Sequence, residues 1–302
     1  MKDFHEKLET ILAAASIRTE EPMKDHTTFR IGGPAEFYVT PKTEAELVDA
    51  VKLCRKEGMP FHVIGNGSNL LVSDRGFKGV VLSTECLTRW EISGEDTGGV
   101  MTACAGILLS RLAKEAAKES LTGLEFAAGI PGTLGGAVVM NAGAYGFEMK
   151  NVLCWARVLD KEGRIKRLTA EQLQLGYRTS CVSPMGYTVL EAGLRLCKGL
   201  REEIYGKMEE LAQRRREKQP LEYPSAGSTF KRPEGHFAGQ LIDQAGLRGY
   251  RIGGAQVSEK HCGFVINRGG ATAADVVNLC DEVRRRVREM SGVELELEVK
   301  HI

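Results

Sequence analysis

Two glycine-rich stretches of the chain have the composition of loops that bind phosphate groups through their backbone. The first, Gly65–Asn69, reads Gly-Asn-Gly-Ser-Asn and follows a short apolar run that ends at Ile64. Successive glycines let several backbone N–H groups point at phosphate oxygens, and the Ser68 and Asn69 side chains could add hydrogen bonds. A hairpin turn built on Asn-Gly would give nearly the same sequence, so this stretch alone leaves both interpretations open.

The second stretch, Gly129–Gly146, reads GIPGTLGGAVVMNAGAYG and holds six glycines in eighteen residues, with no charged side chain. A surface loop would be more polar, and glycine weakens a plain core strand. We therefore expect backbone that passes very close to something large and flat, for which glycine is the permissive residue. The alternative is a tight structural crossing between two packed layers.

Neither stretch has the pattern of the common nucleotide-binding loops. Gly65–Asn69 is not followed by the Gly-Lys-Ser/Thr of a P-loop, and the Leu-Leu-Val at 70–72 is typical of a strand rather than a long helix. Two nearly uncharged glycine-rich loops nevertheless favour a large cofactor with a pyrophosphate. A flavin dinucleotide bound outside the Rossmann fold satisfies both observations.

The whole-chain composition is that of an ordinary enzyme. The 302 residues carry 41 basic and 40 acidic side chains, a net charge of +1, so the global charge gives no argument for a nucleic acid partner. No apolar run approaches the roughly 20 residues of a membrane span, and the charged N-terminus lacks the apolar core of a signal peptide. Eight cysteines, no two within five positions of each other, indicate reduced thiols and no zinc site. We expect a cytoplasmic protein without a metal or a membrane partner.

Hydrophobic periodicity and capping residues predict alternating helices and strands around these loops. Thr43 and Thr272 are typical N-caps. The predicted helices cover residues 3–16, 43–58, 108–118, 202–218, 241–246 and 273–290. The predicted strands cover residues 35–39, 61–64, 70–72, 79–82, 100–105, 152–159, 164–168, 188–196, 263–267 and 293–302. The last strand alternates Val or Leu with Glu, so Glu294, Glu296 and Glu298 are expected to share one face.

Five motifs occur in the order seen in the UDP-N-acetylenolpyruvoylglucosamine reductase family, and the chain resembles that family over essentially its whole length. These motifs are GNGSNLLVSDRGFKGVV, GIPGTLGGAVVMNAGAYG, GYRTS, PSAGSTFKRP and LELEV. The first two are similar to FAD domains of the vanillyl-alcohol-oxidase, or PCMH, type, and the last three to the reductase. The resemblance implies an α+β fold with two FAD-binding subdomains, 1–82 and 83–200, and a C-terminal α+β substrate-binding domain, 201–302.

Three residues match the family's catalytic groups. Arg178 in Tyr-Arg-Thr-Ser matches its arginine, Ser228 in Ala-Gly-Ser its proton donor, and Glu298 its carboxylate. Taken singly, an arginine in a loop, a serine in a turn and a glutamate on a terminal strand would each be assigned to the surface or to turn formation. The motifs around them favour the catalytic interpretation.

The resemblance also implies FAD and NADPH as cofactors and assigns residues to their site and to the substrate. The FAD-binding residues carried over are Arg30, Gly65, Asn66, Gly67, Ser68, Asn69, Gly129, Ile130, Pro131, Gly132, Thr133, Gly135, Gly136, Asn141, Ala142 and Gly143. The substrate-binding residues carried over are Tyr177, Arg214, Lys218, Arg232 and His261. Without the resemblance, the triplet at 214–216 would be assigned to a solvated helix face and His261 to a structural role.

These residue types suit the reduction of an enol ether that carries a carboxylate. Hydride from reduced flavin goes to the terminal vinylic carbon, which sends negative charge toward the carboxylate, where a fixed guanidinium stabilises it. The carbon next to the carboxylate then gains a proton, for which Ser228 must be positioned by Arg178 or by the cofactor's edge. Glu298 could bind the enol form through a shared proton if its pKa is raised.

The resemblance therefore predicts NADPH-dependent, FAD-mediated reduction of UDP-N-acetylglucosamine enolpyruvyl ether to UDP-N-acetylmuramate, a step in peptidoglycan precursor synthesis. We expect a monomer that acts on this small nucleotide-sugar. Two alternatives stay open: an FAD-dependent oxidase of an alcohol or hydroxy acid on the same fold, and a non-catalytic nucleotide-sugar sensor. Ser228 follows Arg178 by only 50 positions, which resembles the shorter subtype of the family, without the tyrosine loop that closes over the substrate. How the UDP moiety is held is therefore open.

Overall fold

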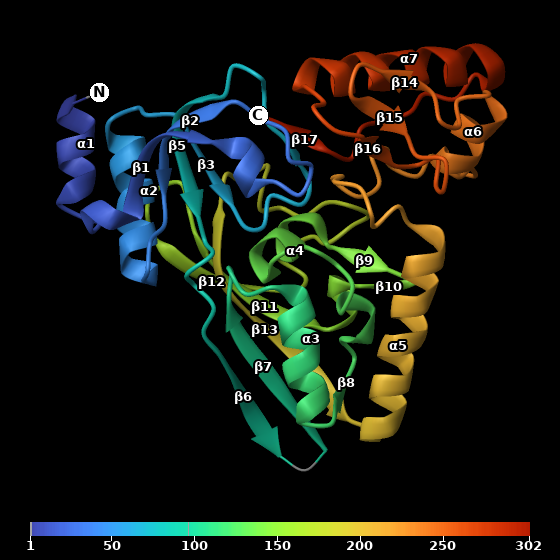
Figure 1. Cartoon of the computed structure of the whole chain (residues 1–302). Coiled ribbons are helices and arrows are strands. Elements are labelled where there is room, and N and C mark those ends of the chain that lie inside the picture. The colour runs from blue at the N-terminus through green and yellow to red at the C-terminus, as the bar shows by residue number, and fades with distance from the viewer. Residues whose placement is uncertain (1, 96) are drawn as a thin grey trace. The chain divides into compact units, whose positions relative to one another are not determined.

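The computed structural model describes residues 2–95 and 97–302, which form two compact units (Figure 1). Unit 1 comprises the segments up to Thr19, Phe37–Asn66 and Gly79–Arg215. Unit 2 comprises Glu20–Glu36, Gly67–Lys78 and Arg216–Ile302. Both units are therefore discontinuous in sequence, and the three-part division at 1–82, 83–200 and 201–302 stays a prediction.

The first sheet has four strands in the order β1-β2-β5-β3. Their bounds are β1 Ile17–Pro22, β2 Pro34–Val39, β5 Phe77–Ser83 and β3 Phe61–Ile64. Helices α1 (Lys2–Glu9) and α2 (Glu44–Lys56) share a core with this sheet's unit 1 residues. As predicted, Thr43 caps α2, since its hydroxyl accepts a hydrogen bond from Glu46 N at 3.2 Å. The predicted helix at 3–16 is shorter, because a separate 3₁₀ turn, η1 (Ala14–Ser16), follows α1.

The second sheet of unit 1 has six antiparallel strands, ordered β12-β11-β13-β7-β6 with β8 beside β13. The bounds are β6 Trp90–Glu95, β7 Gly98–Cys104, β8 Leu121–Thr122, β11 Leu153–Leu159, β12 Ile165–Thr169 and β13 Thr188–Lys198. Helix α3 (Leu109–Lys118) lies against the sheet in Figure 1. β6 was not predicted, because only Trp90 and Ile92 give its six residues an apolar pattern.

A short helix, α4 (Leu134–Met140), occupies the middle of the second glycine-rich stretch, where the sequence indicated no helix. Leu134, Ala137 and Val138 bury its inner face in the unit 1 core. The helix start is fixed by two backbone bonds, from Leu134 N to Ile107 O at 2.9 Å and from Gly135 N to Ala105 O at 2.8 Å. A Cβ on Gly135 would lie only 2.9 Å from the Ala105 Cβ. Glycine is therefore required by helix packing, although it masks the helical pattern in the sequence.

The remaining elements of unit 1 are a short hairpin, two 3₁₀ turns and most of a long helix, whose last three residues belong to unit 2. They are the hairpin β9 (Gly143–Ala144) and β10 (Phe147–Glu148), the 3₁₀ turns η3 (Glu125–Ala127) and η4 (Met149–Asn151), and the long helix α5 (Arg201–Lys218). The charged helix predicted at 202–218 is thus confirmed as α5.

Unit 2 builds its own core from segments far apart in the sequence. Helix α7 (Ala273–Ser291) lies across a three-stranded antiparallel sheet, β14-β15-β16, with α6 beside it (Figure 1). The other bounds are β14 Arg251–Ile252, β15 Ala255–Val257, β16 Val265–Asn267, α6 Ala238–Gln244 and η2 Met23–His26. Phe29, Ile31 and Leu71 from the early segments are buried in the same core. Within residues 2–95 and 97–302, no helix is long and apolar enough to cross a membrane.

The C-terminal segment differs from the predicted strand at 293–302. Only β17 (Lys300–His301) is regular, and it pairs in parallel with β4 (Leu70–Leu71). Leu297 is 39% exposed while Glu298 is 8% exposed, the reverse of the predicted alternation. Glu294 and Glu296 are both exposed, so the predicted shared face fails at Glu298 alone, because the segment pairs with different partners along its length and does not lie on one continuous sheet.

The hairpin between β11 and β12 depends on the buried carboxylate of Asp160. This group accepts hydrogen bonds from Arg164 N at 2.8 Å and Arg164 Nε at 3.0 Å, and it pairs with Lys166 Nζ at 2.8 Å. Burial alone would raise the pKa of Asp160, but the hydrogen bonds from Lys166 and Arg164 outweigh it and hold the pKa well below its usual range. The ionised carboxylate therefore stabilises the folded state.

We predict that Asp160→Asn lowers the melting temperature at pH 7, and that the difference from wild type shrinks as the pH falls below about 4. The sign follows because the folded-state pKa is depressed, so the stabilisation exists above the unfolded-state pKa and is lost toward acid. Melting curves from pH 7 to pH 3 measure it. Glu162→Gln, which removes an exposed partner of Arg164, is the control and should change little. A penalty independent of pH would contradict the prediction.

Candidate FAD and substrate site

The two glycine-rich stretches meet inside unit 1. Asn66 Nδ2 donates a hydrogen bond to Pro131 O at 2.6 Å. Beside it, the backbone of Gly65 lies so close to Thr133 that a Cβ at position 65 would overlap the Thr133 hydroxyl. Only glycine permits this approach, so residues 65–66 and 131–133 form one continuous backbone surface.

The other predicted FAD-binding residues of unit 1 have varied surroundings. Gly136 is exposed, and the nearest atom to a Cβ there would be Thr133 Oγ1 at 3.7 Å. Gly129 packs against Arg215, whose Nη1 would lie 3.0 Å from an added Cβ. Several of the others make contacts within the protein. Two do so through backbone hydrogen bonds: Gly132 O accepts from Leu109 N, and Ala142 N donates to Ala137 O. Three do so by packing: Ile130 on the core, Gly135 on Ala105, and Gly143 on the β10 backbone. Their role in binding FAD stays a prediction.

This surface fits a pyrophosphate-bearing cofactor. Residues 65–66 and 129–136 contain no acidic side chain, so nothing in these loops repels phosphate. Gly136 is exposed and has no atom closer than 3.7 Å to its missing Cβ, so its backbone is open to the close approach that a dinucleotide demands. The residues present in unit 1 are therefore suited to hold FAD.

Arg178 lies in a tight turn on the same unit. Gly176 and Thr179 exchange two backbone hydrogen bonds, at 3.1 and 3.2 Å, so Tyr177 and Arg178 form the tip. Arg178 has a left-handed backbone, with φ of 54°, which is costly for a residue other than glycine and is often found at functional sites. Its Nη1 donates to Gly143 O at 3.3 Å, and its guanidinium carbon lies 5.6 Å from the Tyr177 ring centroid. The β9 hairpin thus orients the half-buried guanidinium.

Two residues predicted to bind substrate lie on the surface of unit 1. Tyr177 is 54% exposed at the tip of this turn. Arg214 pairs with Glu210 one helical turn earlier on α5, at 3.0 Å, and both side chains are exposed. Arg214 therefore has the surroundings of a solvated helix face, while its neighbour Arg215 is the half-buried member of the triplet, with a pKa lowered by burial.

In unit 2, the turn that carries Arg30 is held by buried polar groups. Arg30 has φ of 54°, and its backbone N donates to Thr27 O at 3.1 Å. The Asn267 side chain, 7% exposed, donates to the carbonyls of Phe29 and Arg30 at 3.2 and 3.4 Å. Arg30 also lines a pocket of about 370 Å³ together with Lys24, Asp25 and Thr27. The sequence offered one signal for Asn267, a polar residue that ends the apolar strand β16.

Part of the first glycine-rich stretch belongs to unit 2, where it contacts the C-terminal segment. A Cβ on Gly67 would overlap His26 O, so this glycine also marks a close backbone approach. Ser68 is half-buried next to it. Asn69 Nδ2 donates to Glu298 O at 3.1 Å, and Asn69 O accepts from Lys300 N at 2.9 Å. The Asn69 side chain therefore positions the backbone at Glu298.

Unit 2 also places the Ser228 and Glu298 segments side by side. Glu298 N donates to Thr229 O at 2.8 Å, and the next residues pair as a bridge, Phe230 with Leu297. Thr229 is 1% exposed, and its hydroxyl accepts a hydrogen bond from Val265 N at 2.9 Å. This bond fixes the loop that carries Ser228 on β16. Ser228 is half-buried directly after Gly227, whose φ is +78°. Two of the three predicted catalytic residues are thus held on one framework.

The remaining substrate candidates, His261, Lys218 and Arg232, lie in unit 2. His261 Nδ1 accepts a hydrogen bond from Gly263 N at 3.1 Å, so the neutral ring carries its proton on Nε2. Burial lowers the pKa of His261, and the positive charges of Arg248 and Lys218 lower it further, which keeps the ring neutral near pH 7. Lys218 is exposed at the end of α5, and Arg232 stacks on the exposed Phe237 ring at 3.9 Å.

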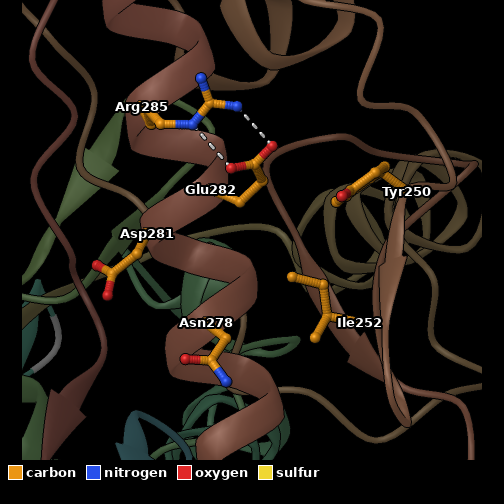
Figure 2. Close-up of a pocket in the computed structure, with 6 residues that line it drawn as sticks. All are labelled: Tyr250, Ile252, Asn278, Asp281, Glu282 and Arg285. Carbon is orange, nitrogen blue, oxygen red and sulfur yellow. Dashed lines mark hydrogen bonds and ion pairs between the residues drawn. The ribbon is translucent and has the colours of Figure 1, made fainter.

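A second pocket of unit 2, about 410 Å³, lies between α7 and β14 (Figure 2). Its lining residues are Tyr250, Ile252, Asn278, Asp281, Glu282 and Arg285. Hydrogen bonds from Arg285 and Arg286 lower the pKa of Glu282 to about 2. The strongest charges at this pocket therefore neutralise one another, and no predicted site residue lines it.

Two protein-family models match parts of this chain. A sequence model of the C-terminal domain of UDP-N-acetylenolpyruvoylglucosamine reductase matches residues 219–302, and a model of an FAD binding domain matches residues 35–169. The UDP-N-acetylenolpyruvoylglucosamine reductase of Lachnoclostridium phytofermentans is 54% identical over 298 residues, which cover 98% of this chain and 96% of that protein. The chain belongs to the UDP-N-acetylenolpyruvoylglucosamine reductase family. The resemblance inferred from the five motifs is thereby confirmed, and so is an FAD-binding domain.

Solved structures agree with this family. The crystal structure of UDP-N-acetylenolpyruvylglucosamine reductase from Thermus caldophilus superposes with a TM-score of 0.81 at 39% identity, covering 94% of this chain and 99% of that one. An alkyldihydroxyacetonephosphate synthase matches with a TM-score of 0.50 at 16% identity, over 65% of this chain and 43% of that one, and shares the fold alone. The predicted α+β fold with a PCMH-type FAD domain is confirmed.

We predict that Gly65→Ala weakens FAD binding about tenfold or more, because the added methyl group would overlap Thr133 and displace the loop. Fluorescence titration of the FAD-free protein with FAD measures the dissociation constant. Gly206→Ala is the matched control, since Gly206 lies in α5 with open space around its Cβ position. Wild-type affinity in Gly65→Ala would show that the two loops do not form the FAD surface.

Proposed function

We propose that this chain catalyses NADPH-dependent reduction of UDP-N-acetylglucosamine enolpyruvyl ether to UDP-N-acetylmuramate, with FAD as the intermediate hydride carrier. The observation that carries the proposal is that the Arg178 turn and the backbone surface suited to FAD are both attached to α4 in unit 1. Family membership over 98% of the chain supports the same substrate. The product belongs to peptidoglycan precursor synthesis, which would link the enzyme to cell shape and division and to the cytoplasm.

In this proposal Arg178 binds the carboxylate of the enolpyruvyl group. Its guanidinium is half-buried and already held by Gly143 O at 3.3 Å, so little reorganisation is needed when substrate charge develops. A planar guanidinium can accept a carboxylate with two parallel hydrogen bonds. Preorganised charge of this kind is usually the largest contribution to such a reaction.

Ser228 and Glu298 supply the proton side of the reaction. Ser228 follows Gly227, whose positive φ turns the chain at this point of the loop. Thr229 and Phe230 anchor the loop against the Glu298 segment and β16, so the backbone is fixed directly after Ser228. We assign to Ser228 the transfer of a proton to the carbon beside the carboxylate, and to Glu298 the stabilisation of the enol form.

Lys218, Arg232 and His261 are assigned to substrate recognition in unit 2. Lys218 and Arg232 are exposed cations suited to a diphosphate. Neutral His261 offers Nε2–H as a donor to an uncharged group. Arg214 pairs with Glu210 on an exposed helix face, so binding a diphosphate would require this pair to break.

An anaerobic experiment tests the reaction. NADPH added to the FAD-loaded protein should bleach the flavin absorbance band, and one equivalent of UDP-N-acetylglucosamine enolpyruvyl ether should restore it without oxygen. Return of the band with one substrate consumed per flavin supports the proposal. Bleaching without return would favour the oxidase alternative, for which a substrate alcohol should bleach the flavin and oxygen should restore it.

Ser228→Ala separates the two half-reactions. We predict that NADPH still reduces its flavin at the wild-type rate, whereas reoxidation by the enolpyruvyl ether slows by roughly 100-fold or more, as expected when a general acid is lost. Stopped-flow absorbance measures both rates. Ser225→Ala in the same loop keeps the backbone carbonyl that accepts from Thr28 and should react as wild type. A nucleotide-sugar sensor would be indifferent to Ser228→Ala.

A further inference from the structure

Asn141 is buried at the point where α4 ends. It is 1% exposed and has a left-handed backbone, with φ of 42°. Its side-chain amide is fully used: Nδ2 donates to Glu148 Oε2 at 2.9 Å and to Gly176 O at 3.0 Å, and Oδ1 accepts from Lys150 N at 2.9 Å. An amide so engaged holds segments together and has no hydrogen left for a ligand.

Asn141 directly follows α4, so its bond to Gly176 connects the start of the Arg178 turn to the end of the helix. Ser180 connects the end of the turn to the same helix. Gly176, which accepts from Asn141, opens the turn. Ser180 lies just after the turn and is 4% exposed, and its hydroxyl donates to Val139 O in α4 at 2.7 Å. Both ends of the turn therefore rest on the last residues of the helix. The first residues of the same helix follow Thr133, which contacts the Gly65 loop.

We propose that Asn141, assisted by Ser180, is a positioning residue that fixes the guanidinium of Arg178 relative to the FAD loops through helix α4. This assignment rests on the proposed role of Arg178 in carboxylate binding, and it replaces the prediction that Asn141 itself binds FAD. The strained backbone of Arg178 needs such support, because a residue other than glycine keeps a left-handed conformation only where its surroundings enforce it.

The amide of Asn141 cannot be exchanged for a carboxylate. Aspartate has no donor for Gly176 O, and it would place a second negative charge against Glu148 Oε2, now 2.9 Å from Nδ2. Asn141→Asp therefore carries a risk of misfolding. Asn141→Gly is the sharper variant, because glycine accepts the left-handed backbone without strain. It deletes only the side-chain hydrogen bonds of Asn141 to residues 148, 150 and 176, which we call the Asn141 bridge.

The sequence offers a matched control two residues before the turn. Gln174 also carries a side-chain amide on a left-handed backbone, with φ of 50°, but its side chain is exposed. Gln174→Gly thus makes the same kind of backbone change in the same loop without removing a buried bridge. We expect this variant to bind FAD and to react as wild type.

The kinetic test uses the FAD-loaded enzyme. In Asn141→Gly, FAD content and flavin reduction by NADPH should be unchanged, while flavin reoxidation by the enolpyruvyl ether slows by up to roughly 100-fold, the cost of misplacing a reacting group by about 1 Å. Slowing of both half-reactions to the same extent, or loss of FAD, would overturn the positioning role and restore Asn141 to the FAD site.

A double-mutant cycle tests whether Asn141 acts through Arg178. In an Arg178→Ala background, Asn141→Gly should have no further effect on reoxidation, because the group that it positions is already absent. If the two substitutions instead slow reoxidation by independent factors that multiply in the double mutant, the inference is overturned. If Arg178→Ala alone leaves reoxidation unchanged, the proposed role of Arg178 is wrong, and that outcome is distinct from a failure of the Asn141 bridge.

Hydrogen exchange of the holoenzyme gives a reading that does not depend on activity. The Gly176 and Thr179 N–H groups, each of which donates to the carbonyl oxygen of the other residue, should exchange at least tenfold faster in Asn141→Gly than in wild type or Gln174→Gly. Amides of the β11–β13 ladder should be unchanged. Unaltered protection at residues 176–179 would show that the bridge does not hold the turn, whatever the reaction proves to be.

Discussion

The close approach of the Gly65 backbone to Thr133 is the constraint on which the arrangement of unit 1 depends. Thr133 directly precedes α4, so this contact and the bonds to Ala105 and Ile107 together hold the start of the helix. The end of the helix is bonded to the segment that carries Arg178. A helix of seven residues is about two turns long and has little freedom to bend. Any displacement at the glycine contact would therefore be transmitted to the guanidinium.

The sequence predicts the fold where local signals agree with tertiary packing. The caps at Thr43 and Thr272, the strands at 61–64 and 152–159 and the charged helix at 202–218 were all found, because periodicity and capping residues act over a few neighbours. The second glycine-rich stretch was predicted to pass close to a large flat group, which stays a prediction; the close contacts in the structure, of Gly135 with Ala105 and of Gly143 with β10, are those of the alternative, a tight structural crossing. Helix α4 was missed, because Gly135 and Gly136 lower helix propensity and the stabilising contacts come from residues 105 and 107, far away in the sequence.

The roles of the site residues were harder to predict from the sequence than the fold was. Glycine can be required by a ligand or by packing, and only the structure separates Gly136, which is exposed, from Gly135, which packs against Ala105. The alternation at 293–302 suggested exposed glutamates, whereas Glu298 is buried by pairing with residue 229. Asn141 and Asn267 gave almost no signal, since the value of a buried amide depends on the carbonyls that it meets.

Unit 2 is assembled from three separate stretches of chain, and this determines when it can form. Its core needs Phe29 and Ile31 from the first stretch and Leu71 from the second, while β4 receives its partner strand only at residues 300–301. During synthesis on the ribosome, about 230 further residues must follow Leu71, and about 270 must follow Phe29, before the partner strand of β4 is made and this core can close. Unit 1 has all its segments by residue 215. The nascent chain is therefore expected to order its flavin-binding half first and to expose Phe29 and Leu71 to chaperones until translation is nearly finished.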